Sequence, residues 1–248
     1  MSNSSRFVVC TYNLWQDERW PERQEPLRQF ITLHRPDILC VQELCPQSQS
    51  LLDQTLPTHQ RVDDPFEGWK RESNIYWNES LFYLLEYGAE NIGILEQWRR
   101  LFWVRLQPQI TGGPPLLVAT AHYTWPGNHQ ERNDRVNVRV AQALNTVKML
   151  RRLATQSSPL LFMGDLNDHY LPLKVLQEGG LTDCFTALGR IPQITRPAYP
   201  TYVHTPQVVD WVLHWGPLQP MTSDVVDFFV GDVAPSDHKP LLATYRWA

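Results

Sequence analysis

The sequence contains five short apolar runs, and each adjoins one small polar motif. The motifs are Thr11-Tyr12-Asn13, Gln42-Glu43, Gly164-Asp165-Leu166-Asn167, Asp210 and Ser236-Asp237-His238. A short run that is rich in β-branched residues and bounded by turn residues is typical of a buried strand. We therefore expect packed sheets whose strand ends bring these groups together. Carboxylate and amide oxygens are the ligands that hard cations prefer, so the pattern indicates Mg²⁺-assisted phosphoryl chemistry.

Other apolar segments predict further strands and two helices. Pro21 opens an expected helix that carries Leu27, Phe30 and Ile31 on one face and that ends before Pro36. A second helix is expected where Val136, Val140, Leu144, Val147 and Leu150 share one stripe. Strands are expected at residues 7–10, 38–42, 75–85, 91–97, 101–106, 116–122, 160–163, 208–214, 225–230 and 241–245. These elements alone allow an α/β or an α+β fold.

The order of the polar motifs resembles that of the endonuclease/exonuclease/phosphatase superfamily, the deoxyribonuclease-like metal-dependent phosphoesterases. Tyr-Asn, Gln-Glu, the strand-end His122, Gly-Asp-x-Asn, Asp-Trp and Ser-Asp-His follow the family's order between Phe7 and Trp247. One such motif is a weak signal, whereas six in order are a strong one. The resemblance implies two packed mixed β-sheets flanked by helices, in a four-layer sandwich. It also implies a single catalytic domain over residues 7–248, after a flexible segment, 1–6.

The resemblance implies that three residues lie near a metal ion. Glu43 would be the principal ligand of Mg²⁺, for which Mn²⁺ could substitute, and Asp237 would be the second carboxylate. Asn13 would bind a metal-linked water or orient Glu43. Taken alone, Asn13 is an ordinary turn residue, and Glu43 could instead accept hydrogen bonds from nearby backbone groups.

Five residues are expected to be catalytic on the same ground. Asp165 would hold or activate the attacking water, Asn167 would stabilise charge on the phosphate oxygens, and His122 would contact the scissile phosphate. Asp210 would orient His238, whose imidazole then acts as a base or as a cationic clamp. Whether Asp165 or His238 accepts the proton of the water stays open. Taken alone, the Gly-Asp pair is a tight turn and a lone strand His is structural.

Two segments depart from the family pattern. Glu96 stands where the family commonly has a small or basic residue, and it either partners His122 or caps a strand. The loop 123–135 has no recognisable subfamily motif, so it does not indicate a substrate. Trp15 and Trp125 follow site-bearing strands, and we expect both to contact substrate by stacking on a base or covering an apolar leaving group. The alternative is that these tryptophans fasten loops to the body.

Charge and composition narrow the choice of partner and compartment. The net charge is −4 and the sequence pI is about 6.1, so the chain lacks the basic footprint of a tight, nonspecific duplex binder. The Arg and Lys clusters at 132–139 and 148–152 are typical of solvated helix faces. No apolar segment is long enough for a signal peptide or a membrane span, and the four cysteines form no CxxC pair. We expect a cytoplasmic monomer without zinc or disulfides.

The sequence therefore predicts a Mg²⁺- or Mn²⁺-dependent hydrolase of phosphoester bonds that uses in-line attack of water. A nuclease or phosphodiesterase acting on DNA is the first hypothesis. A phosphatase or phosphodiesterase on small phosphoesters, inositol phosphates or lipid headgroups is the second. A catalytically silent binding module is the third, but silent members are expected to lose residues such as Glu43, Asp165 and His238, which this chain keeps.

Overall fold

The computed structural model describes residues 6–109, 113–199 and 205–248. Its first sheet contains β1 (Arg6–Asn13), β2 (Ile38–Gln42), β3 (His59–Arg61), β4 (Ser73–Asn78), β11 (Leu218–Val225) and β12 (Leu241–Trp247). Its second sheet contains β5 (Phe82–Glu90), β6 (Leu101–Pro108), β7 (Leu116–His122), β8 (Leu160–Asp165), β9 (Thr182–Asp183) and β10 (Asp210–Trp215). The strand orders are β11-β12-β1-β2-β4-β3 and β5-β6-β7-β8-β10-β9.

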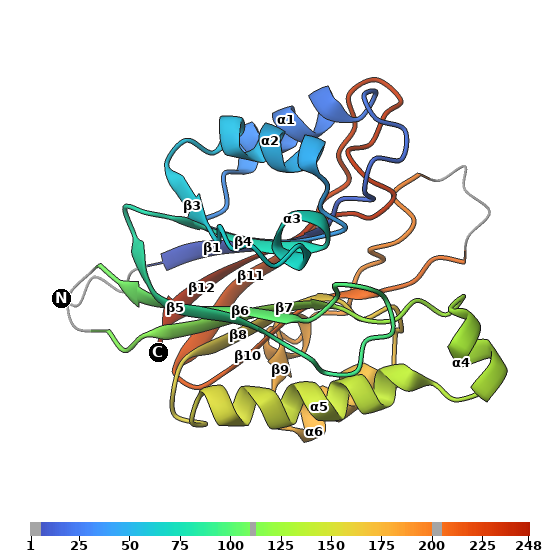
Figure 1. Ribbon diagram of the computed structural model, residues 1–248. Helices are drawn as coiled ribbons and strands as arrows, with labels where there is room; N and C mark the ends of the chain where they lie inside the picture. Colours follow the sequence, from blue (N-terminus) through green and yellow to red (C-terminus); the bar gives the residue numbers. More distant parts are fainter. Residues whose placement is uncertain (1–5, 110–112, 200–204) are drawn as a thin grey trace.

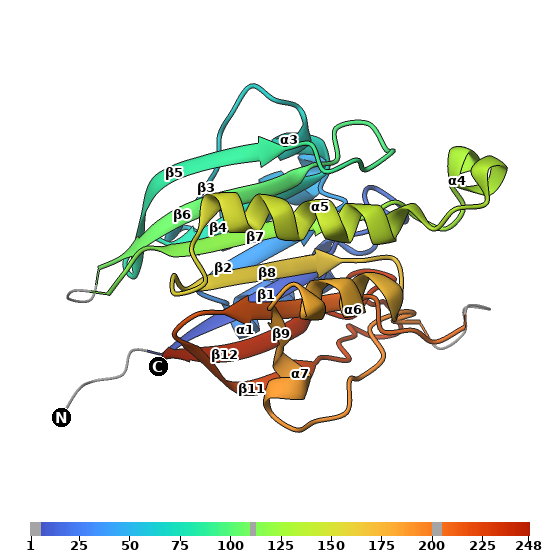
Figure 2. The same ribbon diagram turned by 90° about the horizontal axis from the view of Figure 1, so that it is seen from below.

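The two sheets pack face to face between two layers of helices (Figure 1). Over the first sheet lie α1 (Gln24–His34) and α2 (Pro46–Thr55), with α3 (Gly68–Arg71) at its edge. The second sheet is covered by α5 (Val138–Leu153) and α6 (Leu171–Glu178), with α7 (Cys184–Ala187) beside them, while α4 (His129–Asp134) projects at one end (Figure 2). The four-layer sandwich that the resemblance implied is confirmed.

Strand β2 shows why these runs are apolar on both faces. Ile38 and Cys40 belong to the core between the two sheets, whereas Leu39 and Val41 belong to the core beneath α1 and α2. Successive side chains of a strand point to opposite faces, so a strand with covers on both sides reads as a continuous apolar run. Sheet burial therefore explains the apolar runs, and the polar motifs follow at or near the ends of these strands.

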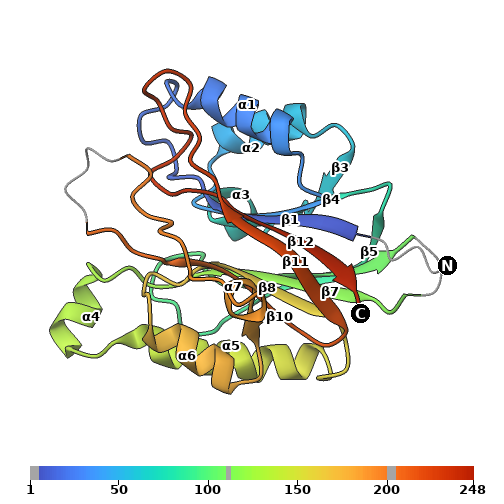
Figure 3. The same cartoon turned by 180° about the vertical axis from the view of Figure 1, so that it is seen from behind.

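Strand register brings the motifs to one end of the sandwich, opposite the chain termini (Figure 3). Strands β7 and β8 are parallel and pair His122 with Asp165. Strand β10 is antiparallel to β8 and pairs Asp210 with Asp165. In the other sheet, β1 is parallel to β2 and pairs Asn13 with Gln42. The end of each sheet thus presents polar groups toward the same region.

Three predicted strands were wrong in extent or existence. The run 75–85 is divided between β4 and β5 by a turn in which the Asn78 side chain accepts a hydrogen bond from Ser80 N. The run 91–97 is not a strand, because Gly93 adopts φ +86° and the Asn91 side chain closes a turn on Gly93 N. Strand β11 ends at Val225, so the predicted strand 225–230 does not form.

The predicted stripe of the second helix was also partly wrong. Val136 precedes α5 and is 57% exposed, and Leu144 is 49% exposed. The helix instead buries Arg139, Gln142 and Thr146 beside apolar residues, because these polar side chains find partners in the loop that follows β7. Apolar periodicity could not show this, since the buried face is half polar.

Two further expectations concern the termini and membranes. Of the flexible segment expected at 1–6, Arg6 begins β1, and residues 1–5 lie outside the described residues. Within the described ranges, no helix combines the length and the apolar character needed to cross a membrane.

The buried His214 on β10 should make the fold sensitive to acid. Burial lowers the pKa of His214 from 6.5 to about 4, and its Nδ1 lies 3.1 Å from the Tyr245 hydroxyl. The stability that depends on the neutral ring is fully present above about pH 6.5 and is lost as the pH falls toward 4. His214→Gln keeps a hydrogen-bonding group but does not titrate. Between pH 6.5 and 4 we expect its free energy of unfolding to fall less than that of the parent, by a difference on the order of 2 kcal/mol. Urea unfolding at several pH values measures this, and parallel pH profiles of the two proteins would contradict it.

Candidate active site

His122, Asp165 and Asp210 lie side by side on three neighbouring strands and are all buried. The close approach of β7 and β8 at this row requires Gly164, because a Cβ there would lie 2.1 Å from the carbonyl oxygen of Ala121. The glycine of the Gly-Asp-x-Asn motif thus sets the spacing of the strands that carry His122 and Asp165.

Asn13 joins the two sheets at this row. Its Nδ2 donates to Asp165 Oδ2 at 3.0 Å and to Glu43 Oε1 at 3.2 Å, while its Oδ1 accepts a hydrogen bond from Trp15 N. Both halves of the amide are therefore engaged, and its contacts orient two carboxylates, as one of the two expected roles requires. Binding of a metal-linked water by Asn13 stays a prediction.

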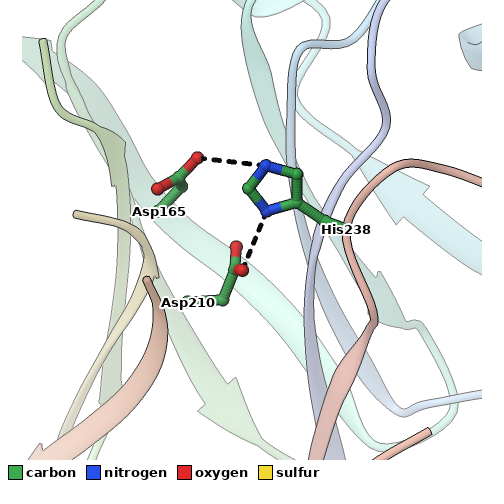
Figure 4. A group of neighbouring side chains, drawn as sticks. All are labelled: Asp165, Asp210 and His238. Carbon is green, nitrogen blue, oxygen red and sulfur yellow. Dashed lines mark hydrogen bonds and ion pairs between the residues drawn. The ribbon is translucent and has the colours of Figure 1, made fainter. Parts of the chain in front are cut away.

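His238 and Asp210 form a buried pair (Figure 4). His238 Nδ1 lies 2.8 Å from Asp210 Oδ2, and His238 Nε2 points toward Asp165 Oδ2 at 3.8 Å. Burial disfavours the imidazolium, but the carboxylates of Asp210, Asp237 and Asp165 outweigh it and raise the pKa of His238 to about 10. Burial and the charge of Asp210 raise the pKa of Asp165 to about 6, against hydrogen bonds and the His238 charge that lower it. The three carboxylates around the ring therefore favour its cationic form.

One ligand atom each from Asp165, Asp210 and His238 lie within 4.8 Å of one another. That spacing would also suit a cation, but His238 Nδ1 is already hydrogen-bonded to Asp210. We therefore interpret the three as a proton-handling group. The Ser236 hydroxyl supports it, because it donates to Asn13 O and accepts a hydrogen bond from His238 N.

His122 is buried against the amide of Asn167. Its Nε2 lies 2.9 Å from Asn167 Nδ2, 3.3 Å from Asp165 Oδ2 and 3.8 Å from Glu43 Oε1. Burial, with the positive charges of Arg99, His238 and Arg196, holds the pKa of His122 well below its usual range, so the ring is neutral. Asn167 N donates to Asp165 Oδ1 at 2.7 Å, so the motif's two polar residues position each other.

Neither expected role of Glu96 is supported. Its carboxylate accepts a hydrogen bond from Asn128 Nδ2 at 3.0 Å and lies 3.9 Å from Arg99 Nη1. The segment that carries Glu96 is a turn, so there is no strand for it to cap. Among the contacts of the described residues, none joins Glu96 to His122, and Glu96 instead anchors the loop after β7 through Asn128.

A pocket of about 500 Å³ collects most of the predicted residues. Its lining includes Trp15, Glu43, His122, Trp125, Asp165, Asn167, Asp237 and His238. Asn13 and Asp210 stand behind this lining and contact Asp165 and His238 from within the protein.

The two predicted tryptophans form walls of the pocket. Trp125 is 50% exposed, and its ring lies across Gly127, where a Cβ would meet the ring at 1.7 Å. Trp15 lies near the Tyr199 ring, with centroids 6.4 Å apart, and against the Arg23 guanidinium. Contact with substrate by either residue stays a prediction.

Three arginines were missed by sequence reasoning. Arg99 lines the pocket, where it is paired with Glu72 at 3.1 Å and donates to Tyr123 O. Arg196 also lines the pocket, and its Nε lies 3.3 Å from Asp237 Oδ2. Both stand in segments without a distinctive motif, and only the fold brings their charges to the site.

Arg23 is fully buried and donates to five backbone carbonyls. Four of these belong to the segment after β1, namely Leu14, Trp15, Gln16 and Glu18, and the fifth belongs to Pro235. The side chain therefore fastens the Trp15 segment to the loop that carries Asp237 and His238. A guanidinium has five N–H donors in a fixed plane, so Lys could not replace these bonds.

The donor set fits a hard divalent cation. Glu43 is partly exposed at the pocket, and the groups nearest its carboxylate, the Asn13 amide and the His122 ring, are neutral. Glu43 therefore lacks a counter-charge from these neighbours, and a bound cation would supply one. Asp237 lines the same pocket and is paired with Arg196.

The sequence matches the model of the Endonuclease/Exonuclease/phosphatase family over residues 10–238. The chain belongs to this family. It is therefore a phosphoesterase by family, and enzymes of this family generally use divalent metal ions. A comparison with curated proteins gives no match.

Solved structures with the family's fold are similar over almost the whole chain. D. rerio TDP2, complexed with a single-strand DNA product, gives a TM-score of 0.80 at 17% identity and covers 97% of this chain and 99% of its own. The mannosyl-6-phosphatase Bt3783 of Bacteroides thetaiotaomicron gives 0.78 at 19% identity, with 96% and 98% covered. The human Nocturnin catalytic domain, with a bound sulfate anion, gives 0.74 at 18% identity, with 98% and 95% covered. At these identities the likeness shows the fold alone.

In a phosphoesterase of this family, Asp210→Asn should lower kcat more than it raises KM. Asp210 contacts His238 and stands behind the pocket lining, so its loss weakens the orientation and charge of the ring without removing a substrate contact. Initial rates over a range of substrate concentrations separate the two constants. An unchanged kcat with a much higher KM would contradict this role.

Proposed function

We propose that the protein is a Mg²⁺-dependent phosphodiesterase that hydrolyses DNA by in-line attack of water. The observation that carries the proposal is the convergence of Glu43, Asp165, Asn167, Asp237 and His238 on one pocket that also contains two guanidinium groups. Carboxylates that hold a cation and cations that face phosphate oxygens are both needed for phosphoryl transfer.

Each group has a place in the reaction. Glu43 and Asp237 would hold the divalent ion, which when bound would supply Lewis-acid stabilisation of charge on the phosphate and the leaving oxygen. Asp165, with a pKa raised to about 6, accepts the proton of the attacking water. His238 is cationic and faces the phosphate as a clamp, held by Asp210. Asn167 and His122 contact the phosphate oxygens, and Arg99 and Arg196 add positive charge.

DNA is the first substrate class, because two tryptophans line the polar active-site pocket and a TDP2 of the same fold has been solved with a single-strand DNA product. A small sugar phosphate is the second candidate. The net charge of −4 favours it, since most of the surface does not attract a polyanion, and a mannosyl-6-phosphatase shares the fold.

A substrate panel tests the proposal. Single-stranded and duplex DNA, an aryl phosphodiester, an aryl phosphomonoester and sugar phosphates are incubated with Mg²⁺, Mn²⁺ or a chelator. We expect cleavage of DNA and of the aryl phosphodiester, and loss of both activities with the chelator. Turnover of monoesters alone would reject the phosphodiesterase, and activity that survives the chelator would reject the metal.

A further inference from the structure

A second pocket of about 400 Å³ adjoins the active-site pocket on the side of Glu43. Its lining includes Gln16, Asp17, Gln47, Arg71, Glu72 and Trp98. Gln16 lines both pockets. Glu72 and Arg99 form an ion pair in which Arg99 faces the active site and Glu72 faces the second pocket. The pockets are therefore neighbours that share a wall.

Backbone conformation also connects the two pockets. Among the described residues, seven non-glycine residues have φ between +44° and +64°, namely Trp15, Gln16, Arg19, Glu43, Trp98, Arg135 and Asn167. Five of the seven line one pocket or the other, whereas Arg19 and Arg135 line neither. Such residues are uncommon, and they concentrate where the surrounding structure fixes side chains for function. Trp98 is thus held in place in the same way as the residues of the active site.

The charges around the second pocket disfavour a second phosphate as its occupant. Arg71 lines this pocket and is paired with Glu67 at 3.0 Å. The pocket also contains the carboxylate of Asp17, which would repel an anion.

The chemistry of the walls suits a neutral ring. The Trp98 indole offers an aromatic surface, and the Arg71 guanidinium lies 5.9 Å from its centre. Gln16 and Gln47 offer amide donors and acceptors at the rim. An aromatic side chain among polar groups is typical of sites on which a base or a sugar ring stacks while its edges form hydrogen bonds.

We propose that this second pocket binds a neutral, hydrogen-bonding ring that is covalently joined to the scissile phosphate. The proposal rests on the proposed function, because it places the phosphate in the active-site pocket. Two sources share this chemistry, namely the base of a nucleotide and the sugar of a sugar phosphate. Trp98 would then be a specificity-determining residue that distinguishes phosphoesters by the group next to phosphorus.

Binding rather than turnover tests this, in a His238→Gln background that prevents hydrolysis. Calorimetry with Mg²⁺ compares inorganic phosphate, thymidine 5′-monophosphate and glucose 6-phosphate. We expect at least one of the ring-bearing ligands to bind about tenfold more tightly than phosphate, as expected for one stacked ring. Adding Trp98→Ala should remove this gain and leave phosphate binding unchanged. The matched control is Tyr83→Ala, an exposed aromatic on β5 that lines neither pocket and should keep the gain.

Arg71→Ala is the second variant, for use if Trp98→Ala does not fold. The Arg71 side chain is half exposed, so we expect its loss to leave the fold intact. A gain with thymidine monophosphate alone identifies the base, and a gain with glucose 6-phosphate alone identifies the sugar. Equal binding of all three ligands, no binding at all, or a gain that survives both variants would overturn the proposal. If no substrate of the panel is hydrolysed but ring-bearing ligands still bind more tightly than phosphate in a manner that depends on Trp98, only the proposed reaction is rejected.

Discussion

Replacing His238 by Gln should lower kcat at least a hundredfold on the best phosphodiester of the panel. Loss of a positioned group that stabilises charge in the transition state commonly costs on the order of 10²–10³ in rate. The Gln amide can still donate to Asp210, so the buried carboxylate keeps a partner and the fold is retained. Stopped and continuous assays of phosphodiester hydrolysis measure kcat, and thermal melting checks the fold.

His214→Gln is the matched control for this variant. His214 is another buried histidine, and it stands on β10 outside the active-site pocket. Its replacement should leave kcat unchanged near neutral pH. If His238→Gln loses less than about tenfold while Asp165→Asn is inactive, the proposed role of His238 as a clamp is wrong and Asp165 acts without it. His238→Ala is a poorer test, because it leaves Asp210 buried without its partner.

Replacing Glu43 by Gln should abolish most activity at low Mg²⁺ and restore part of it at high Mg²⁺. The change preserves volume but removes a negative charge that neither the Asn13 amide nor the neutral His122 ring balances. We expect the loss at low metal to be about a hundredfold, within the range for removal of a catalytic metal contact. Rates measured as a function of Mg²⁺ concentration give the apparent affinity for the metal.

Glu25→Gln serves as the control, because Glu25 is an exposed residue of α1 that faces solvent. It removes the same charge from the chain and should not change the metal titration. Identical titrations for Glu43→Gln and the parent would mean that Glu43 is not a ligand.

The arrangement of the active-site groups could be predicted because each stands at the end of a buried strand. Asp165 and Glu43 follow apolar runs, and parallel neighbours must end at the same edge of a sheet. Arg99 and Arg23 could not be predicted in this way. Arg99 stands in a turn and donates to Tyr123 O, which lies 24 residues away. Arg23 precedes α1, and one of its partners, Pro235 O, lies 212 residues away. Local pattern carries no information about such distant contacts.

The predicted strand boundaries were wrong where side chains compete with the backbone for hydrogen bonds. The run around Gly93 is apolar enough for a strand, but Asn91 and Gly93 favour a turn. The burial of Gln142 was not predicted, for a related reason. Its amide is hydrogen-bonded to Thr124 in the loop that follows β7. The hydrophobic pattern indicates which surfaces are apolar. Hydrogen-bond partners from other parts of the fold determine which polar side chains are buried beside those surfaces.

The position of β1 between β2 and β12 has a consequence for protein synthesis. Strand β1 is translated well before its second neighbour, β12, which is complete only when residues 241–247 have been synthesised. Asn13 meets the Ser236-Asp237-His238 segment only at that stage. A nascent chain that lacks residues 236–247 therefore carries no assembled active site, and it exposes one edge of an apolar strand to chaperones or to other chains.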